Sequence, residues 1–112
     1  MKRPDDLGPR GLGFWEATVA RVDDLGMDLT TDEREILTAA VRTLDEIDGL
    51  EEAIRKNGVT VDGSRGQQVA HPALSAVRAH RVVLGQLLKQ LDLPEEPEPE
   101  TARSSHPKRR RR

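Results

Sequence analysis

The residues with the plainest chemical consequence are the cations near the end of the chain. Five of them are consecutive: Lys108, Arg109, Arg110, Arg111 and Arg112. Clustered cations bind a polyanion by releasing its condensed counterions, with an affinity that ignores base sequence and falls steeply with salt. We expect nucleic acid to be this polyanion; the alternatives are a solubilising role and an acidic patch on a partner protein. The dispersed cations Arg103, Arg65, Arg10, Lys2 and Arg3 are predicted to add phosphate contacts.

Two carboxylates, Asp45 and Asp48, stand one helical turn apart on an otherwise apolar stretch. Such a pair is typical of general acid/base catalysis or of a metal site. A structural role is the stronger interpretation, because Arg42 precedes Asp45 by one turn and two further arginines, Arg78 and Arg81, lie on a segment expected to run antiparallel. We predict ion pairs among these residues, within one chain or between copies, that fix register with little net gain in stability.

Other signatures of catalysis or cofactor binding are missing from the sequence. There is no cysteine, and the histidines, His71, His80 and His106, lack the spacing that places two imidazoles on one helical face. The glycines at 58–66 are not followed by the Gly-Lys-Ser or Gly-Lys-Thr of a phosphate-binding loop. No serine stands in a nucleophile-elbow pattern. We therefore predict a protein that is not an enzyme and needs no metal and no other cofactor.

Apolar residues divide the 112-residue chain into two parts. Every Leu, Ile, Val and Phe lies between Leu7 and Leu93, and no run of them approaches the length of a membrane span. Residues 1–94 carry 12 basic and 16 acidic groups, whereas residues 95–112 carry 6 basic and 4 acidic groups. A segment without apolar side chains cannot offset its ordering entropy. The sequence thus predicts a disordered tail at 95–112, acidic and Pro-rich over Glu95–Glu100 and basic at its end.

The remaining chain reads as mostly helix. Apolar spacing predicts a short helix over 12–24, and a Thr30/Glu33 capping box begins a long helix that Asn57-Gly58 ends. Residues 59–69 suit a small β-hairpin or structured loop, and a third helix is expected over 71–93. The predicted fold is all-α: a long antiparallel helical hairpin, a short N-terminal helix and a flexible N-terminal arm at 1–11. Residues 12–94 would form a helical oligomerisation domain.

The apolar stripes of these helices look wider than one partner helix can cover. The residues predicted to form the core or the contact between copies are Trp15, Leu37, Val41, Leu44, Ile47, Leu74, Val77, Leu84, Leu88 and Leu91. A chain this small buries little more than about 60% of its unfolded surface by itself. We predict self-association, in which a neighbouring copy completes the core. The alternative is that the first helix and the hairpin close the core within a monomer.

The order of these features resembles the small terminase subunits of tailed bacteriophages. The most specific part is Gly-Ser-Arg-Gly-Gln at 63–67 followed by His-Pro-Ala-Leu at 71–74 and Arg78. It follows a long helix that carries Leu44, Asp45, Ile47, Asp48 and Leu50. The Leu-rich stretch 86–94 is similar to the closing helix of this family, and Phe14-Trp15 occupies the place of its early Trp-bearing helix. The resemblance spans residues 8–94.

This resemblance implies a non-enzymatic DNA-packaging factor. Members of the family assemble into homo-oligomeric rings, engage double-stranded viral DNA, and recruit and regulate the large terminase subunit, which holds the ATPase and nuclease. Their place of action would be the cytoplasm of the infected bacterial host, with no membrane partner. The sequence lacks a clear helix-turn-helix, so contacts mainly to phosphates are expected. The alternative function is a helical-hairpin adaptor that binds an acidic protein or RNA.

Overall fold

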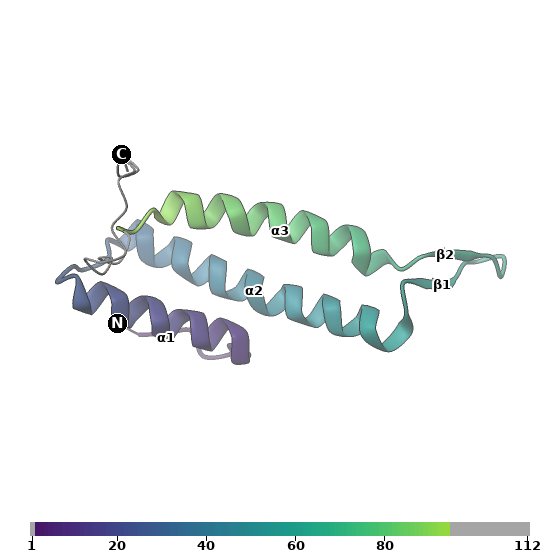
Figure 1. The fold of residues 1–112 in the computed structure, drawn as a ribbon, viewed down its shortest axis with the longest axis horizontal. Coiled ribbons are helices and arrows are strands. Elements are labelled where there is room, and N and C mark those ends of the chain that lie inside the picture. The colour runs from purple at the N-terminus through teal and green to yellow at the C-terminus, as the bar shows by residue number, and fades with distance from the viewer. Residues whose placement is uncertain (1, 95–112) are drawn as a thin grey trace, which may run out of the picture.

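The computed structural model describes residues 2–94, so the predicted tail at 95–112 lies outside the described residues. Within them the elements run α1 (Pro9–Asp24), α2 (Thr31–Asn57), β1 (Thr60–Asp62), β2 (Gln68–Ala70) and α3 (Pro72–Leu91). Helix α2 packs against α1 on one side and α3 on the other, and each neighbour runs antiparallel to it (Figure 1). The predicted fold, a long helical hairpin with a short first helix, is confirmed, and the connection predicted as a small β-hairpin or structured loop is a β-hairpin.

Local signals begin and end α2 as the sequence predicts. The Thr30 hydroxyl accepts a hydrogen bond from the Glu33 amide at 3.1 Å, and the Glu33 carboxylate accepts one from the Thr30 amide at 2.9 Å. Gly58 follows the last turn with a φ of 82°, a conformation that residues with a side chain rarely adopt. Its amide donates to the carbonyl of Ile54, which closes the helix end.

The start of α1 depends on a residue of α2. The amides of Gly8 and Gly11 donate to the Asp45 carboxylate at 2.6 and 2.7 Å, so this side chain accepts from amides that have no partner inside their own helix. Pro9 opens the first turn with its φ already set for a helix. The helix therefore begins at Pro9 rather than at residue 12, and its first turn uses residues expected in a flexible arm.

The ion pairs predicted among Asp45, Asp48, Arg78 and Arg81 do not form within the chain. Asp48 pairs instead with Arg10 at 2.9 Å, and Arg81 pairs with Glu51. The reason is that α1 covers the face of α2 that carries both aspartates, so groups of α1 reach these carboxylates. Among the described residues Arg78 has no ion-pair partner.

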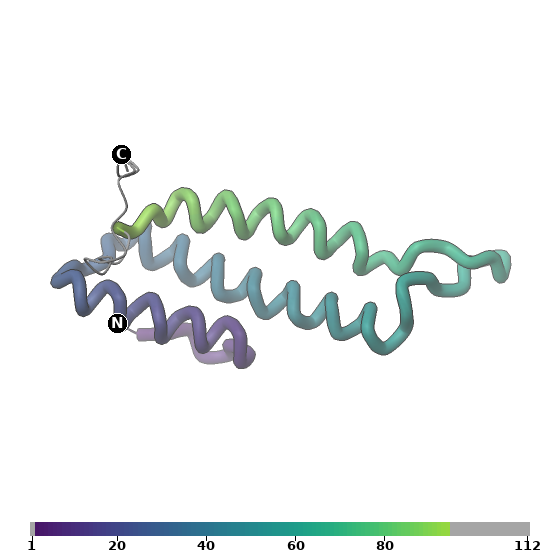
Figure 2. Tube along the Cα trace, viewed as in Figure 1, coloured from purple at the N-terminus to yellow at the C-terminus, as the bar shows by residue number. Residues whose placement is uncertain are grey.

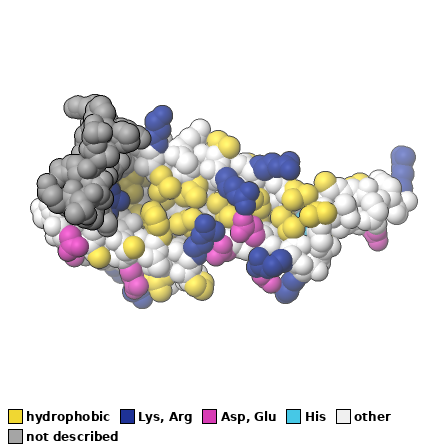
Figure 3. Space-filling view, in the orientation of Figure 1, with side chains coloured by type: hydrophobic (Ala, Val, Ile, Leu, Met, Phe, Trp, Pro, Cys, Tyr) yellow, Lys and Arg dark blue, Asp and Glu magenta, His cyan; other side chains and the backbone are white. Residues whose placement is uncertain are grey.

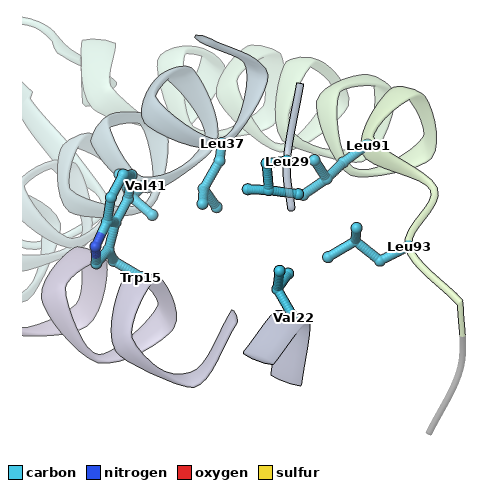
Figure 4. Packing of buried hydrophobic residues seen from close by; sticks show 7 residues of the cluster. All are labelled: Trp15, Val22, Leu29, Leu37, Val41, Leu91 and Leu93. Carbon is cyan, nitrogen blue, oxygen red and sulfur yellow. The ribbon is translucent and has the colours of Figure 1, made fainter. Parts of the chain in front are cut away.

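The buried hydrophobic cluster lies where α1, the α1–α2 connection, the first half of α2 and the end of α3 meet. Figure 4 shows its side chains converging from these elements: Trp15, Val22, Leu29, Leu37, Val41, Leu91 and Leu93. Leu44, Ile47 and Val77 continue the buried strip along α2 and α3. Of the residues predicted for the core, Leu74 and Leu84 are only half-buried and Leu88 is exposed.

The β-hairpin extends beyond the ends of α2 and α3 (Figure 2). Its strands pair Thr60 with Ala70, Val61 with Val69 and Asp62 with Gln68. The turn closes through a hydrogen bond from the Gly63 amide to the Gln67 carbonyl at 2.6 Å. Because the hairpin points away from the helices, it covers none of the buried strip.

Replacing Gly11 by alanine should destabilise the protein by about 1 to 3 kcal/mol, because its Cβ would lie 2.7 Å from the Val41 carbonyl oxygen and overlap the Asp45 carboxylate. The matched control is Gly13→Ala in the same helix, where a Cβ meets nothing within 4 Å. That change should raise stability by about 0.5 to 1 kcal/mol. Urea unfolding of both variants measures the difference, and equal effects would contradict this packing of α1 on α2.

Replacing Asp45 by alanine should cost about 1 to 3 kcal/mol, since two amides at a half-buried helix start lose their acceptor. Asp48→Ala, one turn along the same helix, removes an exposed ion pair and should cost about 0 to 1 kcal/mol. Both variants can be compared by thermal unfolding followed by circular dichroism. Similar decreases in stability would mean that the Asp45 hydrogen bonds do not hold α1.

Candidate functional site

The cations that the sequence assigned to DNA are not gathered into one patch by the described structure. Arg65 is exposed in the turn of the β-hairpin. Lys2 and Arg3 are exposed ahead of α1, and Arg3 lines a shallow depression with Trp15 on that helix. The Arg10 side chain forms an ion pair with Asp48. The basic run and Arg103 lie outside the described residues.

Further exposed cations lie toward the hairpin end of the molecule. Lys56 is in the last turn of α2, Arg78 lies in the first half of α3, and the hairpin joins the end of α2 to the start of α3. These two side chains and that of Arg65 are exposed, and none has an ion-pair partner among residues 2–94. We call Lys56, Arg65 and Arg78 the hairpin-end cations. Lys56 is not among the cations that the sequence assigned to DNA, because a cation in the last turn of a helix is ordinarily explained by the helix dipole.

The opposite end of the molecule is acidic. The end of α1, the connection and the start of α2 carry six carboxylates against two arginines: Asp23, Asp24, Asp28, Asp32, Glu33 and Glu35 against Arg21 and Arg34. Such an excess of carboxylates repels a polyanion locally. The fold therefore separates charge along its long direction.

The histidines of the described part take structural roles. His71 Nδ1 accepts from the Ala73 amide at 3.0 Å and so caps α3. His80 bridges α2 and α3, with Nε2 3.0 Å from the Glu46 carboxylate. Within residues 2–94 no group of three or more His, Cys, Asp or Glu side chains is placed to hold a metal ion. No described helix is long and apolar enough to cross a bilayer.

An apolar strip remains exposed on α3. Val82 and Val83 are 61% and 46% exposed, and they lie on the part of the helix that does not face α2. In Figure 3 hydrophobic side chains gather along the middle of one face of the molecule, with charged side chains around them. Exposed valines in the middle of a helix favour contact with another protein surface.

Comparison with protein-family models matches residues 13–100 to the family described as phage terminase, small subunit. Comparisons with curated proteins and with solved structures give no significant match. The matched range covers most of the chain, from α1 through the hairpin and α3, and it includes the 63–74 stretch that carries the resemblance in the sequence. This chain therefore belongs to the family of phage terminase small subunits.

Proposed function

We propose that this protein is the non-catalytic subunit of a phage packaging terminase, which engages double-stranded viral DNA and recruits and regulates the large ATPase-nuclease subunit in the infected host cell. Family membership is the observation that carries the packaging role. The charge distribution supports the DNA contact, and the exposed strip on α3 supports assembly from several copies.

The DNA contact rests on two sets of cations. The basic run Lys108–Arg112 offers five adjacent charges, and the hairpin-end cations add three exposed ones. Contacts from such cations to phosphates position a protein on a duplex without reading its sequence. The α1–α2 connection is not a suitable segment to enter a DNA groove, because its carboxylates would lie next to the DNA phosphates and repel them. Binding is thus mainly electrostatic.

Self-association follows from the size of the fold and from Val82 and Val83. A second copy that covers these valines would remove apolar surface from water without displacing an existing contact. Each added copy brings another basic run and another hairpin, so interactions that are weak singly become strong together. A closed ring of this kind is the arrangement that we propose.

Removing residues 103–112 should weaken binding to a short duplex and lower the slope of log affinity against log salt by about 0.9 for each phosphate that the chain no longer neutralises. Replacing Lys56, Arg65 and Arg78 together by glutamine should lower affinity as well, because exposed cations are removed without breaking an ion pair. Arg34→Gln at the acidic end is the control and should leave binding unchanged. Fluorescence anisotropy at several salt concentrations measures all of them, and a truncated chain that binds as well as the full chain would contradict the role of the basic run.

Replacing Val82 by aspartate should lower the solution mass to that of a smaller assembly, because a charge would be buried between copies. Ala20→Asp, at an exposed apolar residue of α1, is the control and should leave the mass unchanged. Multi-angle light scattering gives the mass, and circular dichroism verifies that helix content is retained. If the wild-type protein is a monomer and does not bind DNA, the proposal is wrong and the adaptor function is favoured instead.

A further inference from the structure

A groove lies between the second half of α1 and the end of α3. It has a volume of about 470 Å³ and is lined by Phe14, Thr18 and Arg21 on one side and by Leu88, Lys89 and residues 91–93 on the other. Its lining is mixed: Phe14 and three leucines provide apolar surface, and Thr18, Asp92 and the cations Arg21 and Lys89 provide polar surface. Nothing in the proposed function uses this surface.

The Arg21 side chain forms hydrogen bonds with the backbone just after the end of α3. Its Nη2 donates to the Leu93 carbonyl at 3.4 Å and also to the Pro94 carbonyl. Its Nε is buried and has no hydrogen-bond partner within the described residues. A buried guanidinium N–H without an acceptor is costly, and a carboxylate is the acceptor that matches the guanidinium geometry best. The Arg21 guanidinium is thus a cation in the lining of the groove that suits a carboxylate.

We propose that this groove binds the acidic, Pro-rich segment Glu95–Glu100 of the same chain. Because Arg21 binds the Pro94 carbonyl, the segment begins at the edge of the groove, and its effective concentration there is high. One Glu carboxylate pairs with the Arg21 guanidinium, and a second one pairs with Lys89, which has no ion-pair partner among residues 2–94.

The composition of the segment matches the two kinds of surface in the groove. Its glutamates alternate with Pro97 and Pro99, whose rings pack on apolar side chains such as Phe14 and Leu88. Prolines also reduce the entropy cost of ordering a segment. Asp92 is the carboxylate that lines the groove, and the two cations outnumber it.

The surroundings of the groove favour the same position. The neighbouring surface at Asp23, Asp24 and Asp28 repels an acidic segment, so the groove is the most favourable place for it at this end of the molecule. The bound segment would tie α1 to α3, which both pack mainly on α2. It would also fix the place, beside the acidic end, from which the chain continues to the basic run Lys108–Arg112. This inference goes beyond the proposed function, since it concerns a contact of the chain with itself and does not require DNA binding.

Disulfide trapping tests the proposal on the full chain, which contains no cysteine of its own. One variant carries Ala17→Cys, at an exposed residue one turn from Phe14 and Arg21, together with Glu98→Cys. The matched control carries Ala20→Cys, on the side of α1 that lines the depression with Arg3, together with Glu98→Cys. Under mild oxidation the 17–98 bond should form roughly fivefold faster than the 20–98 bond, because the segment spends most of its time in the groove.

The same disulfide assay tests whether the attachment depends on the glutamates, and whether the segment in the groove comes from the same chain or from a second copy. Replacing Glu95, Glu96 and Glu100 by glutamine should remove most of the difference in rate, since the carboxylates make the attachment. Non-reducing electrophoresis separates a bond within one chain from a bond between copies. Equal rates for the two cysteine pairs, an unchanged rate in the glutamine variant, or disulfide-linked dimers as the main product would each overturn the proposal; the last would assign the groove to the segment of a second copy.

Discussion

The arrangement of this protein depends on one carboxylate, that of Asp45, which accepts hydrogen bonds from the first amides of a helix 34 residues or more away in the sequence. A helix of 16 residues is marginal by itself, and α1 has no acidic residue in its first turn to stabilise it locally. Asp45 supplies this stabilisation from α2. The contact requires a glycine at Gly11, because the two backbones approach too closely for a Cβ. The position of α1 then decides which part of α2 is covered.

This constraint produces a molecule with two unlike ends. At one end α1, the α1–α2 connection and the residues after α3 surround Leu37, which is fully buried. Toward the other end α2 and α3 pack only on one another and lead into the exposed hairpin (Figure 1). A two-helix layer buries one stripe per helix and leaves the outer side of α3 uncovered. A further helix packed on that side would complete such a layer.

Charge follows the same division. Carboxylates cluster at the well-packed end, and the hairpin end carries cations that have no ion-pair partner among residues 2–94, although residues 1–94 taken together are net acidic. Average charge would argue against a DNA-binding protein, whereas its distribution favours one, since electrostatic potential depends on where the charges lie. Two arginines lie at the acidic end, Arg21 and Arg34, and both donate hydrogen bonds to backbone carbonyls.

The sequence by itself determined the three helices and the family, because capping boxes and helical apolar spacing act over a few residues and the 63–74 stretch is contiguous. It left the Gly-rich connection open between a β-hairpin and a structured loop. Tertiary structure alone decided the partners of Asp45 and Asp48, the early start of α1 and the exposure of Leu88. Each of these depends on which helical faces meet. Side-chain periodicity shows that a helix has an apolar face, but several neighbours suit that face equally well, and a carboxylate pairs with the donor that packing brings nearest. Local chemistry therefore specifies the elements, and their mutual packing selects the contacts.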